Sequence, residues 1–245
     1  MRIFSRPFAR AFFAGTLAFA AVGGAFAADL PQVFVLGTLY KRHETVPAYD
    51  VKAVARIIEA IRPDVVVLDV NPTELAERKV FPGKVEYTQA IFPYLEKNKT
   101  KAYAGEAAEP EFSRIVQAVI KAREDQKKAN PDGAAAMDAY RKATFEALTS
   151  RWKSPADVNG AASERVVAGM KSYEAWMIGP VEEETSHRWD AVSTEMVLRA
   201  VKENPGKRVL QITGIENLPL VRANLRASGA VELVDMEAWL RANVR

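Results

Sequence analysis

The sequence predicts an α/β protein with a mostly parallel central sheet of about five strands, flanking helices and a long helical insertion. Nearly continuous Val, Leu, Ile and Phe fill residues 33–38 (VFVLGT), 65–70 (VVVLDV) and 208–213 (RVLQIT), a composition typical of strands buried on both faces of a parallel sheet. Between the first two runs, residues 48–61 place apolar side chains at helical spacing, and Pro63 ends the pattern. These segments predict a strand–helix–strand unit with a right-handed crossover.

The remaining strands and flanking helices follow the same patterns more weakly. Residues 101–105 and 231–234 are short apolar runs that we expect to complete the sheet. Helical spacing predicts three further helices at residues 86–98, 219–228 and 236–243.

Residues 110–203 show no strand pattern and predict several helices in a row. The predicted breaks are at Asn130-Pro131, Ser154-Pro155 and Gly179-Pro180. Because a plain crossover needs only about a dozen residues or more, we predict that this segment is an insertion covering the carboxyl edge of the sheet. Its large aromatic side chains, Trp152, Trp176 and Trp189, are predicted to be core residues.

The first 27 residues have the order of a secretory signal peptide. Three arginines precede an apolar stretch at residues 11–24, and Ala-Phe-Ala at residues 25–27 forms a cleavage site. Cleavage would leave residues 28–245 as a single domain in the periplasm, with release from the cell as an alternative. We expect no stable membrane anchor after cleavage, although an uncleaved anchor is the competing interpretation. The chain has no cysteine, so disulfides and thiolate metal sites are excluded.

The charge of the chain argues against some partner classes. There are 34 Lys and Arg against 31 Asp and Glu, and three of the arginines lie in the first 27 residues, which hold no acid. The rest of the chain is therefore formally neutral. Nucleic acid and anionic lipid are not expected as partners, because both attract basic surfaces. A small molecule or a protein of unknown identity remains as the ligand.

Polar side chains gather where the predicted strands end. Because the carboxyl ends of parallel strands meet at one edge of a sheet, we expect these side chains to line a common cleft. Asp69 continues an apolar strand, and Glu106 follows the third strand. A carboxylate at such a place is costly unless it is paired or lies at a cleft, so these two are the catalytic candidates if the protein is active. The ligand-binding candidates are Gly37, Thr38, Tyr40, His43, Arg188, Gly214, Glu216 and Asn217.

Each candidate also has a structural explanation that the sequence leaves open. Tyr40 fits a packed aromatic side chain at the rim of the sheet, and Asn217 fits the N-cap of the following helix. A lone loop histidine such as His43 is usually exposed.

The charged candidates have structural alternatives as well. Arg188 either reaches over the sheet to Asp69 or forms a surface ion pair, and Asp69 itself fits a hydrogen bond to a nearby loop. Ordinary loop and helix-start roles are equally open for Glu106 and Glu216.

Four short motifs follow one another along the chain. They are GTL at residues 37–39, RPDVVVLDVNP at 62–72, HRWDAVSTEM at 187–196 and GKRVLQITGIENL at 206–218. In this order they resemble the TraB/PrgY/Tiki/GumN superfamily, to which the haem-binding ChaN-like proteins are related in fold. The resemblance covers most of the chain after the predicted signal peptide.

For the peptidase-like members, the resemblance implies two G-x-x-H motifs and a glutamate on the second strand, which bind a divalent metal and activate water. In this chain Tyr40 and Asn217 stand at the histidine positions, and Asp69 stands at the glutamate position. The chain has only two histidines, His43 and His187. Since tyrosine and asparagine are poor substitutes for imidazole toward a transition metal, we predict a divergent, non-catalytic member that binds a small ligand or a partner.

Two alternatives remain. In the first, the carboxylates of Asp69, Glu106 and Glu216 hold Mg²⁺, Mn²⁺ or Ca²⁺ and preserve a metal-dependent, peptidase-like hydrolysis. In the second, implied by the ChaN-like relatives, Tyr40 or His43 is an axial ligand of haem. The sequence leaves the cofactor and the presence of any enzymatic activity undecided between these alternatives.

Overall fold

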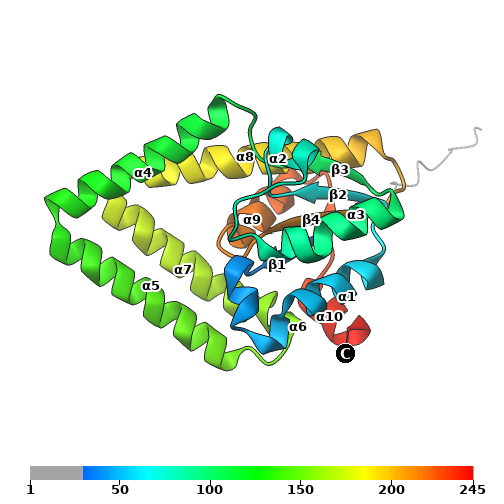
Figure 1. Cartoon of the computed structure of the whole chain (residues 1–245), viewed down its shortest axis with the longest axis horizontal. Coiled ribbons are helices and arrows are strands. Elements are labelled where there is room, and N and C mark those ends of the chain that lie inside the picture. The colour runs from blue at the N-terminus through cyan, green and yellow to red at the C-terminus, as the bar shows by residue number, and fades with distance from the viewer. Residues whose placement is uncertain (1–29, 245) are drawn as a thin grey trace, which may run out of the picture.

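The computed structural model describes residues 30–244, and the predicted signal peptide at residues 1–27 lies outside them. Its sheet is parallel throughout, with the strand order β3-β2-β4-β1-β5 (Figure 1). The strands are β1 (Gln32–Thr38), β2 (Val65–Leu68), β3 (Lys101–Ala104), β4 (Val209–Gly214) and β5 (Glu232–Leu233). The predicted α/β class and the five-stranded parallel sheet are confirmed.

The strand order brings the ends of β1, β2 and β4 together. β4 lies between the other two and pairs with β1 up to Thr38 opposite Gly214, and with β2 up to Leu68 opposite Ile212. Because all three strands are parallel, the residues that follow them leave the sheet at one edge. That edge therefore collects the polar side chains that follow the strands.

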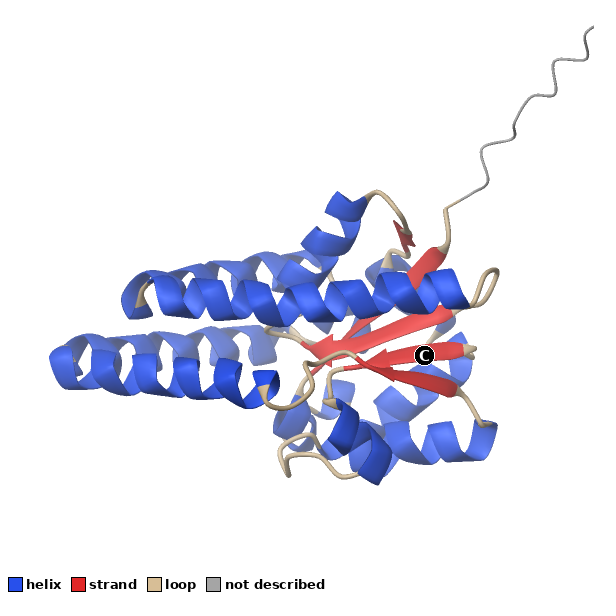
Figure 2. Cartoon of the chain, turned by 90° about the horizontal axis from the view of Figure 1, so that it is seen from above, coloured by secondary structure: helices blue, strands red, loops and turns tan. Residues whose placement is uncertain are grey.

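Alternate residues of each strand face two different cores, as the two-residue period of a strand requires. Phe34 and Leu36 lie in the core under α1, α3 and α10, whereas Val33 and Val35 lie in the core under α8 and α9. Helices therefore cover both faces of the sheet (Figure 2). Their bounds are α1 (Val51–Ile61), α3 (Phe92–Asn98), α8 (Pro180–Glu203), α9 (Leu218–Ser228) and α10 (Met236–Asn243).

Local sequence explains where α1 begins and ends. The carboxylate of Asp50 accepts a hydrogen bond from the Ala53 N–H over 2.7 Å and caps the first turn. Arg62 takes the left-handed conformation at the other end, and Pro63 cannot extend the helix. The predicted start at residue 48 is too early, because a separate 3₁₀ turn, η2 (Pro47–Tyr49), precedes the cap.

The helical insertion lies between β3 and β4 and projects past the carboxyl ends of the strands (Figure 2). It consists of α4 (Glu111–Ala129), α5 (Pro131–Arg151), α6 (Pro155–Val158), α7 (Ala161–Ile178) and the first part of α8. Pro131, Pro155 and Pro180 stand in the first turns of α5, α6 and α8, so the predicted breaks are confirmed. The second half of α8 returns to the sheet, where Val197 and Ala200 are buried.

Three short elements differ from the prediction. The helix predicted at residues 86–98 contains a π-helical segment, η3 (Tyr87–Ile91), before α3 begins. An unpredicted helix, α2 (Pro72–Glu77), follows β2 and is stabilised by a capping box between Asn71 and Glu74. The residues after β1 form a 3₁₀ helix, η1 (Tyr40–Glu44), instead of an open loop.

The three tryptophans of the insertion have different environments. Trp152 is buried, and its Nε1 donates a hydrogen bond to Ser163 Oγ over 2.8 Å. Trp189 is partly buried against Phe112. Trp176 is 76% exposed, so its prediction as a core residue is wrong. An exposed indole of this size is unusual and available for contact.

Within residues 30–244, none of the helices combines the length and the apolar character that crossing a bilayer requires.

Candidate functional site

A group of largely buried polar side chains fills the carboxyl edge of the sheet. We name Tyr40, Asp69, Lys84, Tyr87 and Glu106 the strand-end cluster. The sheet positions three of its members directly, because they follow β1, β2 and β3. The other two approach from the turn before α3 and from its π-helical segment. Both catalytic candidates from the sequence are therefore brought together.

Asp69 lies at the centre of the strand-end cluster. The Tyr40 hydroxyl donates a hydrogen bond to Asp69 Oδ2, and the Gly214 N–H donates to the same oxygen over 3.1 Å. The Asp69 N–H in turn donates to the Tyr87 hydroxyl oxygen over 3.1 Å. Lys84 Nζ donates to the Asp69 backbone carbonyl. These contacts hold the Asp69 side chain in one orientation.

The charges within the strand-end cluster balance one another. Lys84 Nζ lies 3.0 Å from Glu106 Oε1. Burial works against ionisation of Asp69, but Lys84 and hydrogen bonds from its neighbours outweigh it and lower the Asp69 pKa. Burial and the charge of Asp69 raise the pKa of Glu106 well above its ordinary value. The raised pKa of Glu106 favours its neutral form, so the cluster places one ammonium group beside one ionised carboxylate.

The approach of Tyr40 to Asp69 depends on glycine at position 214. A Cβ on Gly214 would lie 2.5 Å from the Tyr40 hydroxyl oxygen and 2.6 Å from Cζ, both closer than real Cβ contacts allow. Tyr40 itself has a φ of 52°, a left-handed conformation that costs roughly 1–2 kcal/mol for a residue with a Cβ. The strained turn aims the tyrosine ring across the end of β4.

His43 is 2% exposed, so the expectation that it is an exposed loop residue is wrong. Its Nε2 accepts a hydrogen bond from the Leu39 N–H over 2.9 Å, and its Nδ1 donates to the Tyr49 carbonyl over 2.6 Å. Burial lowers the pKa of His43 to about 4, so the ring is neutral at physiological pH. Both ring nitrogens are engaged in local hydrogen bonds and hold η1 against η2.

Gly37 and Thr38 serve the packing of the β1 end. The Gly37 N–H donates to Asn159 Oδ1 over 2.7 Å, and its carbonyl accepts from the Tyr49 hydroxyl over 2.9 Å. Thr38 Oγ1 donates to the Thr213 carbonyl over 3.3 Å and ties β1 to β4. Both candidates are buried, with these polar atoms bonded inside the protein.

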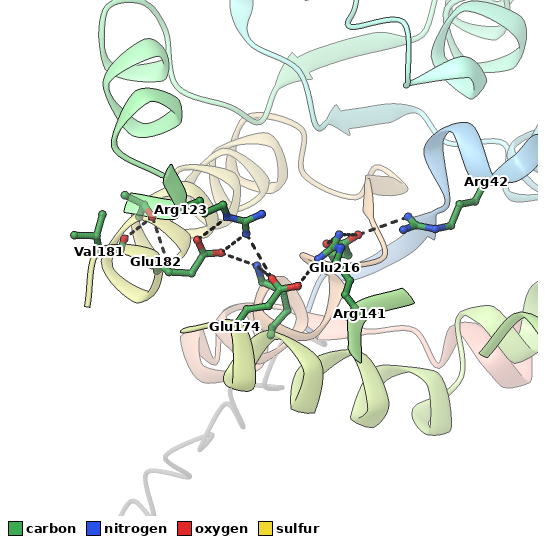
Figure 3. A network of polar contacts seen from close by, with 9 residues as sticks. Arg42, Arg123, Arg141, Glu174, Val181, Glu182 and Glu216 are labelled. Carbon is green, nitrogen blue, oxygen red and sulfur yellow. Dashed lines mark hydrogen bonds and ion pairs between the residues drawn. The ribbon is translucent and has the colours of Figure 1, made fainter. Parts of the chain in front are cut away.

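Glu216 belongs to a network of ion pairs that joins the insertion to the sheet edge (Figure 3). Arg141 of α5 pairs with both Glu216 and the buried Glu174 of α7. The network consists of Arg42, Arg123, Arg141, Lys171, Glu174, Glu182 and Glu216. Glu216 is therefore a neutralised carboxylate that anchors the insertion.

Two other candidates lie away from the strand-end cluster. Arg188 does not reach Asp69. Its guanidinium pairs with Glu111 at the surface, as in the second of the two roles that the sequence left open for it. Asn217 stands at the N-cap position of α9, but its side chain makes no capping hydrogen bond. It lines a cavity instead.

A cavity of about 710 Å³ opens between α7, α8 and the start of α9. Its volume is in the range of small-molecule sites. Apolar groups, including Trp176, Pro219 and Leu220, make up most of its wall. Asp190 and Asn217 are among its polar groups, and the latter follows β4 closely. The cavity therefore adjoins the carboxyl edge of the sheet.

Asp190 is a candidate that the sequence analysis missed. It is 3% exposed, and its Oδ1 has no hydrogen-bond partner. Burial, followed by the charge of Asp69, raises the pKa of Asp190 to about 8. Helical spacing places Asp190 on the face of α8 that carries Val197 and Ala200. This spacing could have predicted from the sequence that Asp190 is buried. Lys84 was also missed, and nothing in its local sequence marks it.

The residues present do not fit the metal or the haem that the resemblance implies. Within residues 30–244, no group of three or more His, Asp or Glu side chains is arranged to hold a metal ion. Lys84 supplies the positive charge between Asp69 and Glu106. The hydroxyl of Tyr40 is bonded to Asp69, and both nitrogens of His43 are engaged, so neither is free as an axial ligand.

Comparison of the chain with protein-family models, curated proteins and solved structures finds no match in any of the three.

Proposed function

We propose that this protein is an exported, TraB/PrgY/Tiki/GumN-like binding protein, a non-catalytic member that holds a small ligand at the carboxyl edge of its sheet. One observation carries the proposal. The Tyr40 hydroxyl is hydrogen-bonded to Asp69, and these residues stand at two of the positions where the resemblance places catalytic groups.

Hydrolysis by this cluster would require a carboxylate that faces water or a substrate. Asp69 and Glu106 are instead buried, and their charge is balanced by Lys84. Freeing either carboxylate would leave its partners buried and unpaired, at a cost of about 1–3 kcal/mol for each hydrogen bond lost. These contacts support a structural role for the strand-end cluster.

The adjoining cavity supports the binding role. It is large enough for a small molecule and mostly apolar, with a few polar groups that could orient a ligand. Export is supported by the basic, apolar and small-residue order of the first 27 residues.

The test starts from the full chain expressed in a bacterial host and recovered from the periplasmic fraction. Mass spectrometry should find an N-terminus at Ala28. Elemental analysis and an absorption spectrum should find neither a stoichiometric transition metal nor a Soret band, and a peptide library should remain uncleaved.

Stoichiometric Mn, Co or Zn, together with peptide cleavage that is lost in Asp69→Ala, would overturn the proposal in favour of a hydrolase. A Soret band would overturn it in favour of haem binding. Recovery of the uncut chain in the cytoplasm would contradict export.

A further inference from the structure

The wall of the cavity contains a buried carboxyl group with one unpartnered oxygen. Asp190 lines the cavity, and its Oδ1 makes no hydrogen bond within the protein. Buried polar atoms are nearly always hydrogen-bonded, and each exception calls for an explanation. Oδ1 is enclosed by the protein, so a ligand in the cavity would supply the missing partner after the carboxyl group turns about its Cβ–Cγ bond toward the cavity.

The neighbouring charged groups of the cavity already have partners. Lys171 Nζ lies 3.0 Å from Glu182 Oε1 and 3.1 Å from Glu174 Oε2. Glu216 is paired with Arg141 (Figure 3). Lys171 and Glu216 are therefore already satisfied by ion pairs, whereas the buried Asp190 still has an unused hydrogen-bond acceptor.

The surroundings of Asp190 favour a cation over an anion. Burial and then the negative charge of Asp69 raise the pKa of Asp190, and the opposing charge of Lys171 is already paired with two glutamates. The field of Asp69 would therefore repel a ligand carboxylate and attract an ammonium group. The indole of Trp176 lines the same cavity and is exposed, so it can pack against an apolar body or contact a cation.

We infer that the cavity between α7, α8 and α9 binds a small amine with an apolar or aromatic body, with Asp190 as the counter-ion of the ammonium group and Trp176 against the apolar part. This inference rests on the proposed binding function and gives it a ligand class.

The experiment compares three probes that share one apolar body and differ in the end group: 4-phenylbutylamine, 4-phenylbutanol and 4-phenylbutyrate. Calorimetry at pH 9, where Asp190 is ionised and the amine is still an ammonium ion, should give about tenfold or greater preference for the amine over the alcohol. This is the size expected for a hydrogen bond to a charged group. The acid should bind more weakly than the alcohol.

Asp190→Asn keeps the shape of the side chain and removes its charge. It should weaken amine binding about tenfold and leave alcohol binding within about twofold. Glu183→Gln is the matched control, because it removes one negative charge from the same cavity at a largely exposed position. It should change amine binding by less than about twofold, since exposed charge pairs contribute little.

Equal or tighter binding of the alcohol or the acid, or unchanged amine binding by Asp190→Asn, would overturn the ligand class. If the alcohol or the acid binds as tightly as the amine, the protein still binds a small molecule, and the proposed binding function stands. Failure of the proposed function shows instead as metal content and peptide cleavage, so the two failures are distinguishable.

Discussion

The hydroxyl of Tyr40 crosses the end of β4 to reach the carboxylate of Asp69. The two residues follow β1 and β2, which do not pair with one another because β4 lies between them. Gly214 ends β4 under the tyrosine ring and adds its own N–H to the same carboxylate oxygen. The hydrogen bond therefore links the ends of three strands at one point.

Replacing Tyr40 by phenylalanine removes the donor and keeps the ring. We expect Tyr40→Phe to lower the free energy of unfolding by about 1–3 kcal/mol, because Asp69 Oδ2 stays buried and loses a hydrogen bond. Chemical denaturation of the purified protein measures this change. Tyr103→Phe is the control, since it removes a half-buried hydroxyl whose hydrogen bonds to Glu203 and Asn204 lie near the surface. Equal effects of the two variants would contradict a special role for the Tyr40 hydroxyl.

Adding a methyl group at position 214 should disturb the same contact. Gly214→Ala places a Cβ against the Tyr40 side chain, and we expect a loss of about 1–3 kcal/mol in unfolding free energy from overpacking. In a Tyr40→Ala background the added methyl should cost much less, because the obstructing ring is gone. Additive effects in this double-mutant cycle would show that the clash is not the cause.

Gly169→Ala is a control in which the added methyl group should stabilise the protein instead of destabilising it. Gly169 lies inside α7, and a Cβ there meets nothing within 4 Å. Because glycine weakens a helix interior, we expect this variant to gain about 0.5–1 kcal/mol.

The buried carboxyl group of Glu86 should make the stability of the folded protein depend on pH. Its side chain is fully buried with no hydrogen-bond partner for either oxygen, and burial raises its pKa from 4.5 to about 7. Between pH 4.5 and 7 the unfolded chain releases this proton while the folded chain keeps it. The stabilisation present below pH 4.5 is thus lost as pH rises through 7, on the order of 3 kcal/mol in total.

Glu86→Gln should therefore gain stability relative to the parent chain as pH rises across this window, and the difference should be constant above about pH 8. Glu96→Gln changes the same charge on an exposed position of α3 and is the control. Denaturant titrations at several pH values measure the difference. A pH-independent difference for Glu86→Gln would mean that Glu86 is ionised in the folded protein.

Amine binding should release a proton at neutral pH. Asp190 is mostly protonated at pH 7, since its pKa is about 8, and must ionise to pair with an ammonium group. Charged and titratable groups around it are Asp69 after β2, Lys171 on α7, Glu182, Glu183 and His187 on α8, and Glu216 after β4. Calorimetry with 4-phenylbutylamine in buffers of different ionisation enthalpy should report close to one proton released at pH 7 and much less at pH 9.

The Asp190→Asn variant should release no proton at either pH. If proton release persisted in that variant, another group would be the counter-ion.

Local patterns in the sequence determined the strands and most of the helices. The runs at residues 33–38 and 65–70 predict buried strands because continuous apolar residues suit a sheet covered on both faces. The helix breaks at Pro131, Pro155 and Pro180 follow from the missing N–H of proline. The strand ends also predicted that Asp69 and Glu106 would meet, since parallel strands share one carboxyl edge.

The pairing of side chains within that edge was decided by the tertiary structure. Lys84 approaches from a turn and places its ammonium group beside the two carboxyl groups, and the buried His43 is held by hydrogen bonds to Leu39 and Tyr49. The burial of Asp190 depends on how α8 packs over the sheet. Periodicity reports which face of an element is buried, whereas a charge is neutralised by whichever group the strand order and helix packing bring within a few ångströms.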